Sequence, residues 1–168
     1  MNREERISWD KKEFEDIHEI IKNKDSLSHY DFLRIRNFKI QNSSPEKEEH
    51  IKEITKKAFE IADKNILAAI TLLSKELDGV GVPVASAILA MKYPEKFCII
   101  DWRVIDELGE TEKFKGYLNS PEIYERYLLL MREKAKNEKK GLREFERELF
   151  ERSIKKSLNN KKRKMIKK

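Results

Sequence analysis

Two glycines separated by one apolar residue, Gly79-Val80-Gly81, lie between two apolar segments of the chain. Glycine accepts positive φ angles and, because it has no side chain, lets another molecule approach the backbone closely. The hairpin continues into Val82 and Pro83, and proline is favoured in the first turn of a helix, where amide hydrogens lack partners. Free backbone N–H groups at the positive end of a helix dipole bind phosphate. We therefore expect a phosphate-binding hairpin at this point.

One carboxylate stands where it could act on a group held by such a hairpin. Asp101 follows the apolar pair Ile99 and Ile100 and precedes Trp102, at the predicted start of a further helix. An ionised carboxylate stabilises positive charge on a reacting group and can also orient or deprotonate water. Its apolar neighbours would raise the pKa of the Asp101 carboxyl, whereas amides at a helix start would lower it. Asp101 is also a natural helix N-cap, and the two roles are compatible.

The hairpin and the aspartate together resemble the helix-hairpin-helix/Gly-Pro-Asp superfamily of DNA glycosylases. The resemblance is close over about residues 65–110, where the chain reads LDGVGVPVASAIL from Leu77 and IIDWRV from Ile99. It implies a compact all-α fold of about eight helices, with the helix-hairpin-helix motif at about 66–92 and the catalytic aspartate loop at 93–104. It also implies that the hairpin binds double-stranded DNA and that Asp101 serves hydrolysis of the bond between a damaged or mismatched base and its sugar. The implied backbone-binding residues are Gly79, Val80, Gly81, Val82 and Val84.

Members of this superfamily that also cut the DNA strand attack the sugar with a lysine. That lysine stands two residues after the second glycine of the hairpin, where this chain has Pro83. Lys75 and Lys92 lie elsewhere in the pattern. The resemblance therefore implies an enzyme that removes a base and leaves the strand uncut.

A base must leave the duplex before its bond to the sugar is cleaved, and a side chain then fills the gap. In the resembled fold a polar loop after the second helix supplies this wedge, and here that loop contains Gln41 and Asn42. An ordinary polar turn between helices is the alternative. Trp102 and Phe97 flank the aspartate loop and are candidates to stack on the base, although buried aromatic residues more often belong to a core. Mismatched pyrimidines, oxidised purines and alkylated purines are all candidate substrates.

Two other classes of protein are compatible with the same residues. The first is a non-catalytic DNA-binding module that retains the hairpin and uses Asp101 only as a helix cap. The second is a helical adaptor that binds other proteins. An Asp101 carboxylate at the floor of a cleft facing the hairpin would favour the enzyme.

The cysteine and histidine content limits the cofactors that the chain can hold. A single cysteine, Cys98, excludes an internal disulfide, fits a reducing compartment, and excludes the four-cysteine iron–sulfur cluster of some superfamily members. The histidines His18, His29 and His50 lack the spacing of a metal site. We therefore expect no metal or iron–sulfur cofactor, although the resemblance allows a monovalent cation at the hairpin.

Length and composition predict a soluble domain with its own core. The chain has 168 residues, of which 40% are charged and 39% hydrophobic. Its longest apolar run, Ile66 to Leu73, is too short to cross a bilayer, and its first residues lack the apolar stretch of a signal peptide. We expect a monomer with no membrane partner, located in the cytoplasm and associated with the nucleoid if the source is prokaryotic.

The formal net charge of +6 is concentrated at one end of the chain. Residues 155–168 carry eight lysine and arginine residues and no acid, whereas the remaining 29 basic residues face 31 acidic ones. We expect a single helical domain over residues 1–157 and a disordered basic tail over 158–168. Such a tail would attract phosphates without reading sequence, or would have no partner at all. Arg34, Arg36 and Lys39 are either phosphate contacts or a solvated helix face.

Helix-start signals recur along the chain, and strand signals are nearly absent. Capping patterns and helix-start prolines mark several of the starts. The expected helices start at Asp10, Ser28, Ser44, about residue 65, Val82, Asp101, Ser120 and about residue 142. The fourth, over about 65–77, is apolar nearly all round, which is typical of a central helix. The last, over about 142–157, is expected to pack with its predecessor against the first helix.

Overall fold

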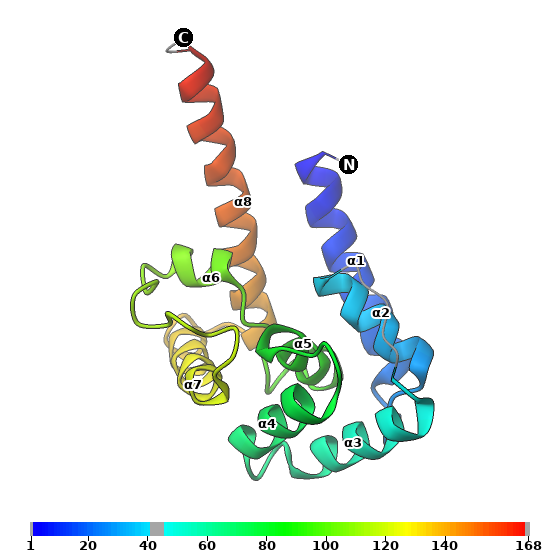
Figure 1. Cartoon of the computed structure of the whole chain (residues 1–168). Helices are drawn as coiled ribbons and strands as arrows, with labels where there is room; N and C mark the ends of the chain where they lie inside the picture. Colours follow the sequence, from blue (N-terminus) through cyan, green and yellow to red (C-terminus); the bar gives the residue numbers. More distant parts are fainter. Residues whose placement is uncertain (1, 41–45, 167–168) are drawn as a thin grey trace.

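The structure, a computed structural model, describes residues 2–40 and 46–166, with side chains described for residues 2, 4–40 and 46–156. Within those residues the chain forms eight α-helices and no strand, which confirms the all-α prediction (Figure 1). The helices are α1 (Arg3–Ile21), α2 (His29–Lys39), α3 (Glu48–Ile61), α4 (Ile66–Glu76), α5 (Val82–Lys92), α6 (Trp102–Glu107), α7 (Pro121–Asn137) and α8 (Leu142–Ile166). α8 thus continues beyond residue 157, where the sequence predicted its end. The side chains of the basic segment 158–168 lie outside the described residues, so its role stays a prediction.

Local signals located most of the helix starts. The side chains of Ser28 and Ser120 each accept a hydrogen bond from the backbone three residues later, at 3.2 Å and 3.3 Å. The predicted start at Asp10 is wrong. α1 begins earlier because Asn2 and Glu5 form a capping box of their own, and Asp10 lies within the helix.

α5 is the central helix of the fold. Ten of its eleven residues are buried, and α1, α2, α4 and α7 all pack against it. In Figure 1 α1 and α2 stand on one side of α5 and α7 and α8 on the other, with α3 and α4 below. α4, which the sequence predicted to be central, buries Ala69, Ile70 and Leu73, while Leu67 and Leu72 line a groove at the surface. Apolar composition could not distinguish the two helices, because both are apolar over most of their surface.

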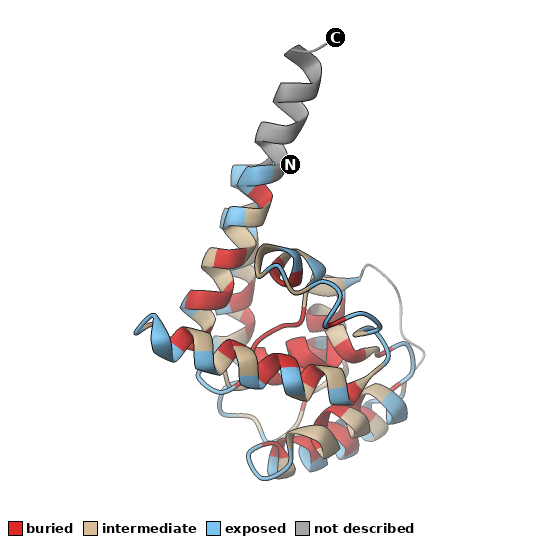
Figure 2. Ribbon diagram, turned by 90° about the vertical axis from the view of Figure 1, so that its left-hand side faces the viewer, coloured by how far each residue is buried: buried red, intermediate tan, exposed pale blue. Residues whose placement is uncertain are grey.

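The core fills the space between the helices. In Figure 2 buried residues lie along the helix sides that face the centre of the molecule, and exposed residues lie on the outer sides. Phe32, Phe97, Phe114, Tyr124 and Tyr127 are among the largest fully buried side chains. Four of these rings come from α7 and from the segments that flank α6, so the core extends to the elements that hold Asp101.

Lys92, in the last turn of α5, is a buried cation with a structural role. Its Nζ donates hydrogen bonds to the carbonyls of Ile21 at 3.0 Å and Lys22 at 2.7 Å, and also to that of Lys24. These carbonyls follow the end of α1, where the backbone has no helical partners. Burial lowers the pKa of Lys92 below its ordinary value. The side chain therefore joins the end of α1 to the end of α5.

We expect Lys92→Met to lower the free energy of unfolding by about 2–4 kcal/mol, because the carbonyls of Ile21, Lys22 and Lys24 all lose a charged donor. Lys96→Met is the matched control. Lys96 forms an exposed ion pair with Asp63, and its loss should cost less than about 1 kcal/mol. Urea unfolding of both variants measures the difference, and equal losses would contradict the role assigned to Lys92.

Candidate functional site

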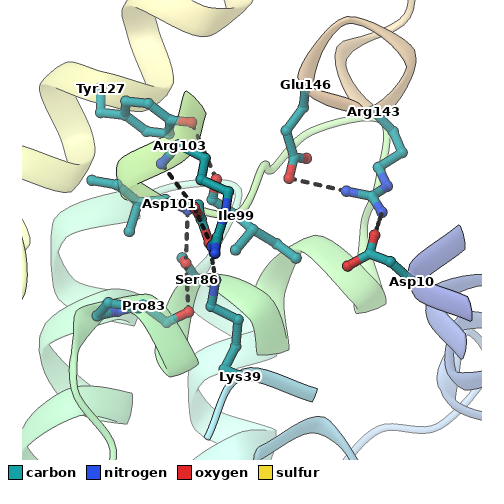
Figure 3. A network of polar contacts seen from close by, with 11 residues as sticks. Asp10, Lys39, Pro83, Ser86, Ile99, Asp101, Arg103, Tyr127, Arg143 and Glu146 are labelled. Carbon is teal, nitrogen blue, oxygen red and sulfur yellow. Dashed lines mark hydrogen bonds and ion pairs between the residues drawn. The ribbon is translucent and has the colours of Figure 1, made fainter. Parts of the chain in front are cut away.

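Asp101 is a partly buried carboxylate held by a backbone amide and a lysine. Its Oδ1 accepts the Arg103 N–H at 2.9 Å, which makes it the N-cap of α6 as predicted. Its Oδ2 accepts a hydrogen bond of 2.8 Å from Nζ of Lys39, at the end of α2 (Figure 3). The two side chains are only 15% and 14% exposed. The Arg103 guanidinium lies farther away, with Nη1 at 3.9 Å from Oδ1.

These contacts decide between the two opposing effects expected on the acidity of Asp101. Burial raises the pKa of its carboxyl, but the charge and hydrogen bond of Lys39 and the Arg103 N–H outweigh burial. The pKa of Asp101 therefore lies below its ordinary value, and the group is ionised at neutral pH. A carboxylate kept charged while largely removed from water interacts strongly with positive charge.

The aspartate loop is fastened to the first turn of α5. The Ser86 hydroxyl donates to the Pro83 carbonyl at 2.7 Å and accepts the Ile100 N–H at 3.1 Å. From α7, the Tyr127 hydroxyl donates to the Ile99 carbonyl at 3.1 Å (Figure 3). The carboxylate thus has a fixed position relative to the helix that follows the hairpin.

The Asp101 carboxylate opens onto a narrow cavity between α1, α2, α6 and α8. The cavity has a volume of about 20 Å³, enough for one water molecule and far too small for a nucleobase. Its lining consists of Asp10, Phe38, Lys39, Ile99, Asp101, Val104, Arg143, Glu146, Arg147 and Phe150. None of these is a residue of the 77–82 hairpin, so within the described chain the Asp101 cavity does not face the hairpin.

Two further carboxyl groups line the same cavity and share one arginine. Arg143 donates from Nη1 to Oε1 of Glu146 at 2.9 Å, and its Nη2 lies 3.6 Å from Oδ1 of Asp10. Burial raises the pKa of Asp10 and of Glu146 above their ordinary values, despite the opposing charge of Arg143. The cavity therefore brings a carboxyl group with a lowered pKa close to two with raised pKa values. Sequence reasoning missed both, since Asp10 matches a capping pattern and Glu146 lies in a charged stretch of α8.

Gly79 is the residue of the hairpin that requires glycine. Its φ is +66°, and a Cβ built on it would lie 2.2 Å from Nη2 of the buried Arg36. Gly81, in contrast, has a φ of −85° and is the N-cap of α5. Of the two glycines, Gly79 alone therefore uses the positive φ that glycine permits.

Part of the hairpin backbone is already hydrogen-bonded. The Val80 N–H donates to the Leu77 carbonyl, and the Val82 N–H donates to the Leu118 carbonyl, both at 3.2 Å. The side chains of Val80, Val82 and Val84 are buried. Among the described residues of the hairpin and the first turn of α5, the amides without a hydrogen-bond partner are those of Gly79, Gly81 and Val84. These three backbone groups are what the hairpin offers to an anion.

The two aromatic candidates lie in different environments. Phe97 is fully buried in the core, beside Tyr93, so its prediction as a base-stacking residue is wrong. Trp102 is 53% exposed and lines an open apolar pocket of about 300 Å³ together with Phe114 and Tyr117. Asp101 does not line this pocket. The exposed indole and the carboxylate therefore line two separate cavities.

The basic residues at the end of α2 point toward the protein. Arg34 forms a two-pronged ion pair with Glu13, at 2.6 Å and 2.9 Å. Arg36 is buried against Gly79, and Lys39 binds the aspartate. These three side chains are therefore not a solvated helix face. The predicted wedge residues Gln41 and Asn42, like the predicted helix start at Ser44, lie outside the described residues.

Comparison with known proteins adds no relative. No family model, no curated protein and no solved structure matches this chain. Among the described residues no group of three His, Cys, Asp or Glu side chains is arranged to hold a metal ion. In the same part of the chain no helix is both long and apolar enough to cross a membrane.

Proposed function

We propose that this chain is a DNA glycosylase of the helix-hairpin-helix/Gly-Pro-Asp kind, which binds duplex DNA and hydrolyses the bond between a base and its sugar. The observation that carries the proposal is Asp101, an ionised carboxylate held away from water and fastened through Ser86 to the helix that follows the hairpin. Breaking the base–sugar bond builds positive charge on the sugar, and such a carboxylate stabilises that charge.

The contact with Lys39 supports this role. The carboxylate of Asp101 already binds one cation, the Lys39 ammonium, at 2.8 Å. A sugar that carries developing positive charge would take the place of that ammonium when DNA binds. Because the cavity is smaller than a base, the walls formed by α2 and α8 must separate for the nucleotide to enter. DNA binding and rupture of the Lys39–Asp101 ion pair are therefore coupled in this proposal.

The hairpin supplies the second element of the proposal. The amides of Gly79 and Gly81 have no hydrogen-bond partner, and Gly79 is exposed while Gly81 is half-buried. Both lie just before α5, where the helix dipole favours negative charge. A phosphate bound there would fix the DNA backbone without reading its sequence. A monovalent cation at the hairpin would need backbone carbonyls as ligands, and those of Leu77 and Leu118 already accept hydrogen bonds. No step of the proposed reaction uses such an ion.

A non-catalytic DNA-binding module is the second candidate. The observation that favours it is the position of Asp101, which caps α6 and opens onto a cavity that no hairpin residue lines. In such a module the hairpin would still bind phosphate, and the ion pair with Lys39 would be purely structural. Both candidates bind duplex DNA through the hairpin, but only the glycosylase cleaves the bond between base and sugar.

Incubation with a panel of duplexes that each carry one altered or mismatched base separates the two candidates. Hot alkali after incubation converts an abasic site into a strand break, which a gel reveals. We expect a break at the altered base for at least one duplex. Binding without any alkali-sensitive site would establish the module, and absence of both binding and breaks would overturn both candidates.

We expect the enzyme to leave the strand uncut before alkali treatment, and borohydride to trap no covalent complex with abasic DNA. Pro83 has no amine. The Lys39 amine is beside Asp101, but it is engaged in an ion pair of 2.8 Å and does not stand at the hairpin position from which the lysine of the resembled superfamily attacks. A complex trapped by the wild type and lost in Lys39→Arg would contradict this prediction and identify Lys39 as the nucleophile.

A further inference from the structure

Three carboxyl groups and three basic side chains line the cavity beside Asp101, but the ion pairs between them are unevenly shared. Asp101 has Lys39 as its partner, whereas Asp10 and Glu146 have a single guanidinium, Arg143, between them. Two carboxylates that share one cation in a buried place repel each other, so the pair binds a proton more readily than either acid does in water. Asp10 and Glu146 thus contact different nitrogens of one guanidinium.

Glu146 presents one oxygen without a partner. Its residue is 4% exposed, its Oε1 accepts from Arg143, and its buried Oε2 has no partner at hydrogen-bond geometry in the described chain, although the Ile99 N–H is near enough to lower the pKa of the carboxyl. Both Glu146 and Asp10 line the cavity onto which Asp101 opens. An unpartnered carboxyl oxygen in a polar cavity that can admit a water molecule is a place from which a proton can be passed on.

Other charged and titratable groups surround the pair from every neighbouring element. α2 contributes Lys39, the aspartate loop contributes Cys98 and Asp101, α7 contributes Tyr124 and Tyr127, and α8 contributes Arg147. Burial raises the pKa of Cys98, Tyr124 and Tyr127 well above their ordinary values, so these three stay neutral. Arg147 is engaged with Glu15 and Glu151. Lys39 and, from α1, Arg6 also lower the pKa of Asp10, but less than Arg143 does, and among the described residues only Arg143 forms an ion pair with either acid.

We propose that Asp10 and Glu146 share one proton and deliver it to the departing base while Asp101 stabilises the sugar. This inference rests on the proposed glycosylase function. The bond between the sugar C1′ and the base nitrogen breaks, its electron pair stays with the base, and the shared proton passes to a base nitrogen. Water then adds to C1′, and the proton that it loses restores the pair. Atoms and charges balance to neutral base plus abasic sugar.

The shared proton defines a class of substrate. A neutral base is a poor leaving group, and protonation as the bond breaks removes the negative charge that it would otherwise carry. An alkylated base such as 7-methylguanine is already cationic and leaves without a proton. A protein that keeps a proton beside its ionised carboxylate is therefore built for neutral bases, whether mismatched or oxidised.

The first test needs no DNA. A carboxyl whose pKa is raised on folding contributes stability that is fully present below its unfolded pKa and is lost as pH rises through its folded pKa. The stability of the wild type relative to Glu146→Gln should therefore fall as pH rises above about 4.5, the ordinary value of Glu146. Glu148→Gln is the matched control on the same helix. The hydrogen bond from Lys140 lowers the pKa of Glu148, so there the relative stability should fall as pH decreases. A pH-independent difference for Glu146→Gln overturns the shared proton.

The second test measures base release at several pH values from duplexes with uracil, hypoxanthine, 8-oxoguanine, mispaired adenine or 7-methylguanine. We expect Glu146→Gln to lower release of the neutral bases by about 10²–10³-fold and to leave 7-methylguanine release unchanged. If Glu146→Gln fails to fold, Asp10→Asn takes its place, because it retains the Arg143–Glu146 contact. Asp10→Asn should change base release in the same sense. Release of 7-methylguanine alone by the wild type, or equal losses for both classes of base, overturns proton delivery. No release of any base by the wild type overturns the glycosylase function itself, and proton delivery with it.

Discussion

Replacing Asp101 with asparagine should lower base release by about 10²–10⁴-fold without weakening affinity for duplex DNA. Asparagine keeps an oxygen that can accept the Arg103 N–H, so the cap of α6 is retained. The variant loses only the negative charge, which is the property that the reaction needs. Single-turnover base release and DNA binding, measured side by side, separate chemistry from binding.

The same substitution has a stability effect that the ion pair explains. Without the carboxylate, the Lys39 ammonium, whose side chain is only 14% exposed, loses a charged hydrogen bond worth about 1.5–3 kcal/mol. Because the folded-state pKa of Asp101 is lowered, its stabilisation is present above the ordinary value of 3.8 and is lost as pH falls through the folded pKa. The wild type and Asp101→Asn should therefore converge in stability in acid.

Asp106→Asn is the control for the Asp101 variant. Asp106 is an exposed acid on the same helix, and its replacement should change neither base release nor stability appreciably. If Asp101→Asn released bases as fast as the wild type, the catalytic role would be refuted and the cap and ion pair would remain as its functions. A loss of DNA affinity equal to the loss of rate would instead indicate a structural effect.

Gly79→Ala should be the most destabilising single-methyl addition in the hairpin. The left-handed backbone at φ +66° costs a residue with a Cβ about 1–2 kcal/mol. The new Cβ would also lie 2.2 Å from Nη2 and 3.1 Å from Cζ of Arg36, whose buried side chain cannot move aside into solvent. Overpacking of this kind typically costs about 1–3 kcal/mol more.

Gly109→Ala separates the two contributions. Gly109 has a φ of +71°, close to that of Gly79, but no heavy atom lies within 4 Å of a Cβ built there. Its substitution should therefore cost only the backbone part, about 1–2 kcal/mol. The difference between the two variants in urea unfolding reports the contact with Arg36. Equal destabilisation would show that the guanidinium does not lie against the hairpin.

The sequence by itself determined the features that depend on a few consecutive residues. The caps at Ser28 and Ser120, the bounds of α5 and the position of Asp101 at the start of α6 were all predictable. Each arises from hydrogen bonds that span at most four residues, and residue type at fixed spacing encodes such bonds directly. The start of α1 was missed for the same local reason, because an earlier capping box lies upstream of Asp10.

Only the tertiary structure decided which side chains share the cavity. Lys39 and Asp101 are 62 residues apart in the chain, and the acids that line the cavity with them come from opposite ends of the sequence. Such pairings depend on how helices pack around α5, and no spacing in the sequence records that packing. The contact of Arg36 with Gly79 is of the same kind. The sequence thus located the hairpin and the carboxylate, whereas the lowered pKa of Asp101 and the raised pKa values of Asp10 and Glu146 follow from burial and charge that exist only in the folded chain.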